Sequence, residues 1–318
     1  DFNAMSIMQT TVAAELVAVP AKRRGGFWHT FIRNPKAVVG LGIFLVFTLM
    51  SVWPGLFTSV GDPNELAFAP AGPPSADHIL GTTALGQDIW AQLVFGARQS
   101  LVVAVVAGGC ATVLSVLVGV TAAYLGGIVD DVLSLLTNAI LVIPAFPLII
   151  IFAKYAGQGG LLVILAVLIF TGWSYGANQL RAQALSLRTR DFLEAARVRG
   201  ERRSYIIVAE VLPNLASLIV ATFLNAALYS VLTAAGLQFL GLGDSNSVSW
   251  GTMLYWSQNQ QALQTGMPLW SLAPGLCVAL LGASFALMNY AFDEISSPAL
   301  RSVRRNRARR SGERGDVG

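Results

Sequence analysis

The chain has 318 residues, of which 54% are hydrophobic and 12% charged, with a formal net charge of +4 and a mean hydropathy of +0.62. The charged residues are gathered in a few segments, so the remainder forms apolar runs long enough to cross a bilayer core of about 30 Å. Lipid offers backbone groups no hydrogen-bonding partners, and such runs must therefore be helical. The composition excludes a mainly water-soluble chain and predicts an all-α membrane protein.

Six apolar runs are expected to span the membrane: residues 37–57, 99–125, 132–153, 160–180, 213–236 and 269–292. The first run is too long for the apolar part of a signal peptide, so we interpret it as an uncleaved span. The expected organisation starts with a cytoplasmic lead-in (1–36) and the first transmembrane helix (37–57). An external segment (58–97) follows and is expected to become helical from Thr83. A five-helix core (98–295) with a polar loop at 181–212 and a basic tail (296–318) complete the chain. Met5 could be the first native residue, which leaves the origin of residues 1–4 open.

Cations mark one side of this predicted bundle. Three clusters fall before the first span, between spans four and five, and after the sixth: Lys22, Arg23, Arg24, Arg33 and Lys36; Arg181, Arg188, Arg190, Arg197, Arg199, Arg202 and Arg203; and Arg301, Arg304, Arg305, Arg307, Arg309 and Arg310. Cytoplasmic loops carry such an excess, so both termini are expected in the cytoplasm. The tail favours contacts with anionic lipid over nucleic acid. Only the short loop with Asp130 and Asp131 lacks a cation.

Several residues inside the runs predict details of packing. Pro144, Pro147 and Pro274 remove backbone donors and are expected to bend their helices. Glycines on span two are expected to allow close helix approach: Gly108, Gly109, Gly119, Gly126 and Gly127. Cys110 and Cys277 both fall within spans, which favours buried thiols over a disulfide.

A short polar helix is predicted at residues 191–199. Asp191 is expected to cap it and Glu194 to reach back to the cap, as in a capping box. Arg197 and Arg199 lie where cations favour the negative helix end, and Gly200 can adopt the left-handed conformation that ends it. A membrane bundle needs such a helix only if something on the aqueous side acts on it.

This segment resembles the EAA loop of ABC-importer permeases. The resemblance is carried by Glu194-Ala195-Ala196, by Gly200 after three further residues, and by Leu212-Pro213. In that family the loop forms a coupling helix that docks into a separate ATPase subunit. The resemblance implies that Asp191 and Glu194 cap this helix, Ala195 and Ala196 form a small docking face, Gly200 sets the turn, and Arg197 and Arg199 are polar contacts or topology anchors.

Further blocks resemble the C-type permease subunit of dipeptide, oligopeptide and nickel importers. They are His78-Ile-Leu-Gly-Thr82, Leu85-Gly-Gln-Asp88, Gly96-Ala-Arg-Gln-Ser100, Gly236-Leu-Gln-Phe-Leu-Gly-Leu-Gly243 and Trp250-Gly251. The chain departs from the family pattern where relatives often carry other residues, at Thr83, Ala84, Gln87, Leu135, Asn138, Glu210 and Tyr290. These departures leave the coupling helix intact.

The resemblance implies a six-helix permease in a bacterial inner membrane. Its expected partners are a homologous second permease, two P-loop ATPases and an external solute-binding protein. ATP and Mg²⁺ would bind to the ATPases, and this chain would bind no cofactor or metal. No G-x-x-x-x-G-K-[ST] motif occurs in the sequence, so energy for uphill transport would come from a partner. Peptides are the first expectation for the substrate, and no substrate-binding residue is predicted.

The positions of the ionisable residues argue against several other functions. Gly241-Leu-Gly-Asp244 matches a motif of intramembrane aspartyl proteases, but these need two neighbouring carboxylates, and Asp244 lies on the side opposite Asp130. His29 and His78 are predicted on opposite sides, which argues against a zinc site or a Ser–His pair. An ion-driven carrier or a channel subunit remains the alternative. Such carriers usually hold mid-membrane ionisable groups, which the predicted spans lack.

Overall fold

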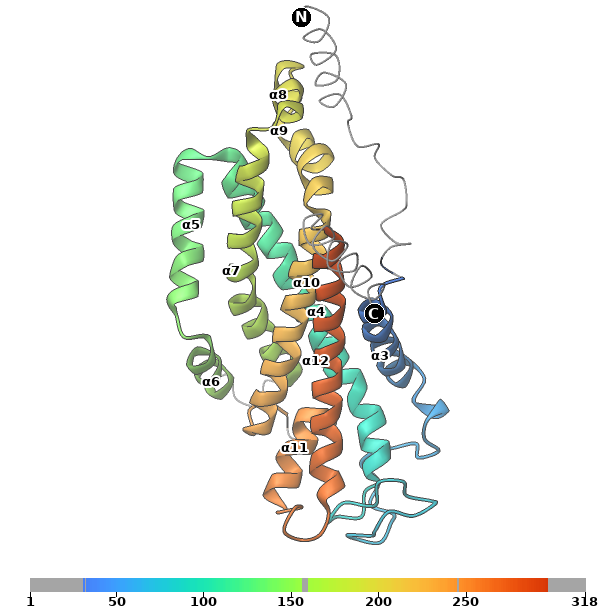
Figure 1. The fold of residues 1–318 in the computed structure, drawn as a ribbon. Coiled ribbons are helices and arrows are strands. Elements are labelled where there is room, and N and C mark those ends of the chain that lie inside the picture. The colour runs from blue at the N-terminus through green and yellow to red at the C-terminus, as the bar shows by residue number, and fades with distance from the viewer. Residues whose placement is uncertain (1–30, 32, 156–159, 245, 297–318) are drawn as a thin grey trace, which may run out of the picture.

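The computed structural model describes residues 31, 33–155, 160–244 and 246–296, and in these ranges it is a helical bundle without strands. Its main helices are α3 (Pro35–Val52), α4 (Ile89–Leu125), α5 (Gly127–Val142), α6 (Ala145–Tyr155), α7 (Gly160–Arg188), α8 (Asp191–Val198), α10 (Leu212–Phe239), α11 (Trp250–Asn259) and α12 (Pro268–Ser296). The long helices run along one axis; α8 lies at one end, and α11 lies at the other with the irregular segment before α4 (Figure 1). The all-α prediction is confirmed.

Five helical stretches are long and apolar enough to cross a membrane: Pro35–Val52, Ile89–Leu125, Gly160–Arg188, Arg203–Phe239 and Pro268–Glu294. They coincide with five of the six predicted spans. The first ends at Val52 rather than 57, because Trp53 precedes Pro54 and leaves the helical conformation (φ −126°, ψ 68°). The fourth stretch begins with the short α9 (Arg203–Tyr205) and a π-helical turn, η2 (Ile206–Val211), which lead into α10.

The predicted span at 132–153 is a broken helix. α5 and α6 meet at a bend of 80°. Ile143 is extended (φ −67°, ψ 125°) because Pro144 follows it, and the proline cannot donate the hydrogen bond that would continue α5. The expected effect of Pro144 is confirmed. Pro274 lies inside α12, which continues through it.

The segment before α4 is folded by side-chain hydrogen bonds, and the predicted helix from Thr83 is wrong. The Thr83 hydroxyl accepts from the N–H groups of Leu85 (3.3 Å) and Gln87 (3.1 Å), which closes a local turn. The helix begins only at Ile89, where Asp88 caps it by accepting from Ala91 N–H at 2.7 Å. The second Asp88 oxygen contacts His78 Nδ1 at 2.7 Å.

α4 is the centre of the bundle and packs against α7 and α10. A Cβ atom at Gly108 would collide with the backbone of Ala227, and one at Gly119 with the carbonyl of Ala177, so both glycines permit close helix contact as predicted. Ser115 adds a hydrogen bond from its hydroxyl to the Trp173 carbonyl at 2.6 Å. Small residues thus set the spacing of the central helices.

Some of the predicted packing positions on α4 do not contact another helix. A Cβ at Gly109 would meet nothing within 4 Å, and Gly126 and Gly127 form the turn between α4 and α5. Cys277 is buried, but Cys110 is exposed, because it follows Gly109 on the side of α4 that faces away from α7 and α10. The prediction of two buried thiols is wrong for Cys110.

Candidate functional site

α8 is attached to the end of the bundle by two side chains. Leu193 and Ala196 are completely buried (0% exposed), and they belong to a cluster with residues from α4, α7, η2 and α10. The other six residues of α8 are exposed. Because Leu193 and Ala196 lie three positions apart on a helix, they form one face, and the opposite face is left open to solvent. Figure 1 shows α8 standing beyond the ends of the long helices.

The N-terminus of α8 differs from the predicted capping box. The cap residue is Arg190, which is extended (φ −82°, ψ 140°), and no side chain caps the helix. Asp191 is already the first helical residue, because the chain turns one position earlier than expected. Asp191 and Glu194 both lie in the first turn, where their charges are favourable near the positive end of the helix dipole. Their predicted role as caps is wrong.

The C-terminus of α8 agrees with the prediction. Gly200 has φ +77°, a conformation that favours glycine. Gly200 N–H donates to the Arg197 carbonyl (3.0 Å) and Glu201 N–H to the Ala196 carbonyl (3.3 Å). This pair of bonds is a Schellman motif, which satisfies carbonyls that the helix end would leave without partners.

The expected docking face of two alanines is divided between the two sides of α8. Ala196 packs inward against the bundle, whereas Ala195 is exposed, so both cannot contact a partner. The correction follows from helix periodicity, which places neighbouring residues about 100° apart. The outward face instead consists of Asp191, Glu194, Ala195 and Val198, at the spacing i, i+3, i+4 and i+7.

Sequence reasoning overlooked an apolar component of this surface. Val198 is 83% exposed and Phe192 is 37% exposed. Helix periodicity applied to 191–198 would have separated Val198 from Leu193, and the signal was therefore available. Val198 therefore gives the outward face of α8 one apolar side chain among its polar ones.

The predicted arginines have different environments. The Arg197 guanidinium lies over the Tyr124 ring, 5.7 Å from its centroid, and therefore ties α8 to the end of α4. Arg199 Nε is 3.7 Å from Glu201 Oε1, an exposed pair of little energetic weight. Arg202 and Arg203 are exposed. The basic tail, and Lys22, Arg23, Arg24 and His29, lie outside the described residues.

In the acidic loop, which lacks a cation of its own, Asp130 is paired with a cation of α7. Arg181 donates to both oxygens of Asp130, from Nε at 2.6 Å and from a terminal nitrogen at 2.8 Å. This bidentate pair joins the start of α5 to α7. Asp244 follows α10 at the other end of the bundle (Figure 1), which keeps it away from Asp130 and separates the carboxylates that a protease dyad would need.

A second candidate site lies between α5, α7 and α10. A cavity of about 410 Å³ is lined by apolar side chains of α5 and by polar side chains that include Thr171, Tyr175, Gln179, Asn225 and Tyr229, and the lining residues that the structure describes carry no charge. Nearby, Asn178 donates to Asn138 across α7 and α5 at 3.2 Å. Helical spacing of Tyr175, Asn178 and Gln179 within an apolar run was the sequence signal for this surface.

The fold defines the class of the chain as a multi-pass helical membrane protein. A family model for the binding-protein-dependent transport system inner membrane component matches residues 115–296, and one for the N-terminal TM domain of oligopeptide transport permease C matches residues 24–71.

Relatives agree with the two family models. The oligopeptide transport system permease protein OppC of Mycobacterium tuberculosis is 34% identical over 289 residues, which cover 90% of this chain and 98% of the relative. The dipeptide transport system permease protein DppC of Alkalihalophilus pseudofirmus is 31% identical over 85% of this chain and 88% of its own. The glutathione transport system permease protein GsiD of Pectobacterium atrosepticum is 27% identical over 87% and 91%. The chain belongs to the binding-protein-dependent transport system inner membrane component family.

Proposed function

We propose that this chain is the C-type permease of an ATP-driven peptide importer and that the outward face of α8 transmits force from an ATPase subunit. The observation that carries the proposal is the construction of α8. Leu193 and Ala196 fix it to the ends of the bundle, and Asp191, Glu194, Ala195 and Val198 remain available to a partner. A push on this face would reach α4, α7 and α10 through the buried anchor.

In this proposal the end of the bundle that carries α8 faces the cytoplasm, because the exposed arginines at 190–203 gather there. Two P-loop ATPases would bind ATP and Mg²⁺ and supply the energy, and this chain would be a non-catalytic subunit. A homologous second permease would complete the path, and a solute-binding protein would deliver cargo from outside. The names of the relatives, which refer to oligopeptides, dipeptides and glutathione, support peptide cargo.

We assign the cavity between α5, α7 and α10 to the wall of the path. Its hydroxyl and carboxamide groups can hydrogen-bond a passing solute, and a wall without net charge does not hold an ionised peptide terminus strongly. Peptides of different sequence would therefore cross without being trapped.

The test is a matched pair of substitutions. Ala195→Trp enlarges the outward face of α8, whereas Ala182→Trp makes the same change on the exposed surface of α7. Overpacking an interface costs about 1–3 kcal/mol, which is roughly a tenfold to hundredfold loss of affinity. We expect Ala195→Trp to lose the ATPase subunits on purification in mild detergent and Ala182→Trp to retain them.

Reconstitution tests the energy source. ATP-dependent uptake by the purified complex in liposomes is expected to stop with Ala195→Trp. Uptake by this chain alone, driven by an ion gradient without ATP, would instead support the secondary carrier.

A further inference from the structure

α5 is the long helix that the bundle holds least firmly. Of its 16 residues only Thr137 is buried, whereas α4 and α7 each bury many. α5 packs mainly against α4 and α7, and on its other side Leu135 is 71% exposed and Val142 82% exposed. A segment with few buried contacts opens at a low cost in free energy. A movement of α5 would therefore leave the core of the bundle intact.

Both ends of α5 are joined to the bundle through residues that suit a hinge. At one end, Gly126 (φ +67°) and Gly127 (φ +57°) form the turn from α4. At the other end, the extended Ile143 and Pro144 separate α5 from α6. Glycine changes its backbone conformation at little steric cost, and proline interrupts the helical hydrogen bonds. A helix between two such joints can swing as a unit, because the joints absorb the change in φ and ψ.

Side-chain hydrogen bonds to α7 hold α5 in place. The Asp130–Arg181 pair joins the first turn of α5 to α7, and Asn178 donates to Asn138 at 3.2 Å about two turns further along. The bidentate pair is the stronger of the two contacts because both partners are charged. α7 packs closely on α4, where a Cβ at Gly119 would collide with α7. These contacts therefore fix α5 relative to the core.

The start of α5 lies at the end of the bundle that carries α8 (Figure 1). Arg188, the last residue of α7, lies against the glycine turn, since a Cβ at Gly126 would be 2.8 Å from a terminal nitrogen of its guanidinium. Arg197 of α8 lies over the ring of Tyr124, two residues before Gly126. A displacement of α8 would therefore act directly on the joint between α4 and α5.

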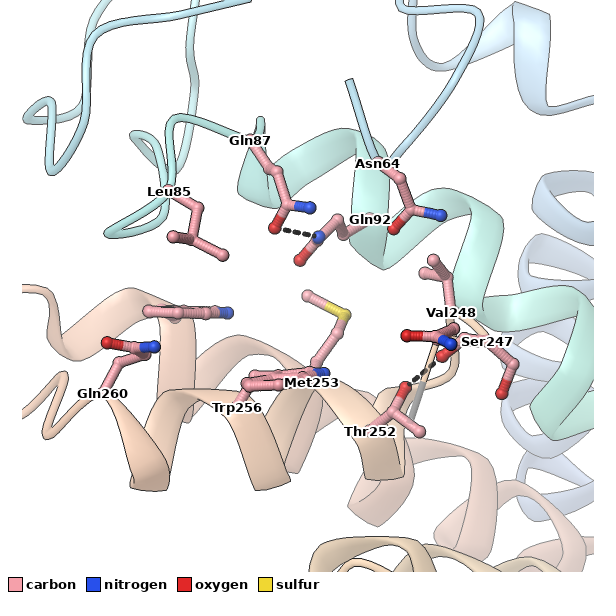
Figure 2. A pocket seen from close by; sticks show the side chains of 12 residues that line it. Asn64, Leu85, Gln87, Gln92, Ser247, Val248, Thr252, Met253, Trp256 and Gln260 are labelled. Atoms are coloured by element: carbon pink, nitrogen blue, oxygen red, sulfur yellow. Dashed lines mark hydrogen bonds between the residues drawn. The ribbon is translucent and has the colours of Figure 1, made fainter. Parts of the chain in front are cut away.

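The opposite end of the bundle is fixed by comparison. Figure 2 shows a cavity of about 370 Å³ there, between α11 and the segment before α4, where Gln92 donates to Gln87 Oε1 at 2.9 Å. Trp250 of α11 donates to the Leu93 carbonyl of α4 at 2.9 Å. The indole N–H of Trp270 is enclosed in the same region, without a hydrogen-bond partner in the described part of the chain. Because α4 is tied to α11 here, movement is expected at α5 and not at this end.

We propose that α5 is the gate helix of this permease and that the Asp130–Arg181 pair is the latch that holds it closed against α7. The inference rests on the proposed importer and names the element that α8 moves. A push on α8 shifts the joint at Gly126, Asp130 separates from Arg181, and α5 swings away from the cavity between α5, α7 and α10. Arg181 is a positioning residue, because it sets the place of one wall of the path without contacting the solute.

The first experiment measures the position of α5 in the full transporter complex in nanodiscs. In a variant with Cys110→Ser and Cys277→Ala, spin labels are placed at two exposed positions, Leu135→Cys on α5 and Leu280→Cys on α12. One distance is expected without ATP, and a second, open distance with ATP and vanadate. Arg181→Gln is expected to raise the ratio of open to closed α5 about tenfold without ATP, because it removes a charge-assisted pair.

Three controls separate a latch from a general loosening of the bundle. Lys36→Gln removes the cation of the ion pair between α3 and α12 and should leave the α5 distances unchanged. Labels at Val113→Cys on α4 and Leu280→Cys should report the same distance in every variant. The exchanged variant, Asp130→Arg with Arg181→Asp, should restore the closed distance.

The second experiment locks α5 against α7. In the same cysteine-free background, Asn138→Cys and Asn178→Cys are joined by a short bis-methanethiosulfonate reagent, which leaves the latch residues in place. ATP-dependent uptake of radiolabelled trialanine into liposomes is expected to stop and to return when a thiol reductant cleaves the link. Each single cysteine, carrying a monofunctional reagent of the same length, is the control for added bulk and is expected to retain uptake.

The gate is wrong if Arg181→Gln and the parent chain give the same α5 distances, or if Lys36→Gln shifts these distances equally. It is also wrong if the cross-linked complex takes up trialanine as fast as the single-cysteine controls, and in that case peptide import itself is intact. If the unlinked parent complex takes up no trialanine with ATP, the proposed function fails.

Discussion

Gly200 occupies a backbone conformation that side chains with a branched Cβ tolerate poorly. At φ +77° it directs the chain from α8 toward α9, and its N–H belongs to the bonds that end α8. A Cβ at this position would meet no atom within 4 Å, so any cost of substitution comes from the backbone and not from a collision. The residue therefore isolates the effect of turn geometry.

Gly200→Val is expected to destabilise the end of α8 by about 1–2 kcal/mol, the cost of the left-handed conformation for an L-residue. Membrane insertion should be unchanged, while co-purification of ATPase subunits and ATP-dependent uptake should fall. Gly42→Val is the control, because a Cβ there also meets nothing and its φ is ordinary. Normal assembly and transport by Gly200→Val would show that the turn is not required.

The Asp130–Arg181 pair is the second residue-scale feature open to a test. Their side chains are 16% and 30% exposed, and two hydrogen bonds join them. Asp130→Asn leaves Arg181 without its counter-charge and is expected to cost about 1–3 kcal/mol, seen as a lower melting temperature in detergent. The exchanged variant Asp130→Arg with Arg181→Asp should recover part of the loss. A melting temperature unaffected by Asp130→Asn would mean that the pair does not stabilise the bundle.

At the scale of elements, apolar runs located the helices, but local chemistry decided their ends. Thr83 and Asp88 are both residues that can cap a helix, and only the structure shows that Thr83 closes a turn while Asp88 caps α4. The capping box failed for a similar reason, because Arg190 turns the chain one residue early. The sequence alone did not separate these alternatives, since each depends on which hydrogen bonds the rest of the segment makes available.

The break between α5 and α6 makes a prediction of its own. Pro144→Ala restores a backbone donor and removes the restriction on Ile143, so the 80° bend should relax. Spin labels on α5 and α6 are expected to report a longer and broader distance distribution than in the parent chain. Pro147→Ala, inside α6, is the control. An unchanged distribution would assign the bend to packing against α7.

For the whole molecule, the distribution of charge predicts which end faces the cytoplasm. In a variant with Cys110→Ser and Cys277→Ala, expressed without ATPase subunits that would cover α8, Ala195→Cys is expected to react with a membrane-impermeant maleimide only in inverted vesicles. Asn64→Cys should react only in intact cells from which any outer membrane has been removed, because it lies in the irregular segment at the opposite end. Reaction of both positions from the same side would contradict the proposed orientation.

The sequence sufficed for the class of the molecule and for the location of α8, because long apolar runs and a glycine after a polar helix are local signals. It did not indicate that Ala196 faces inward or that Trp270 lacks a partner. The burial of Ala196 depends on how α8 packs against α4, α7, η2 and α10, and the surroundings of Trp270, which lies in α12, include α11 and the segment before α4. By contrast, helix periodicity over 191–198 is enough to put Leu193 and Val198 on different faces, and the structure adds that Leu193 is the one that is fully buried while Val198 is 83% exposed.

The π-helical turn η2 lies between α9 and α10, and it determines the direction, around the axis of α10, in which α9 and α8 leave the helix. A π turn holds about one residue more than an α turn, and one residue advances an α-helix by about 100° around its axis. α9, with the short connection back to α8, is therefore rotated by more than a quarter-turn from the direction that an uninterrupted α-helix would give. Deleting one residue of η2 would leave Leu193 and Ala196 in the sequence. It would nevertheless rotate α8 so that these two side chains point away from the hydrophobic cluster of α4, α7 and α10 in which they are buried.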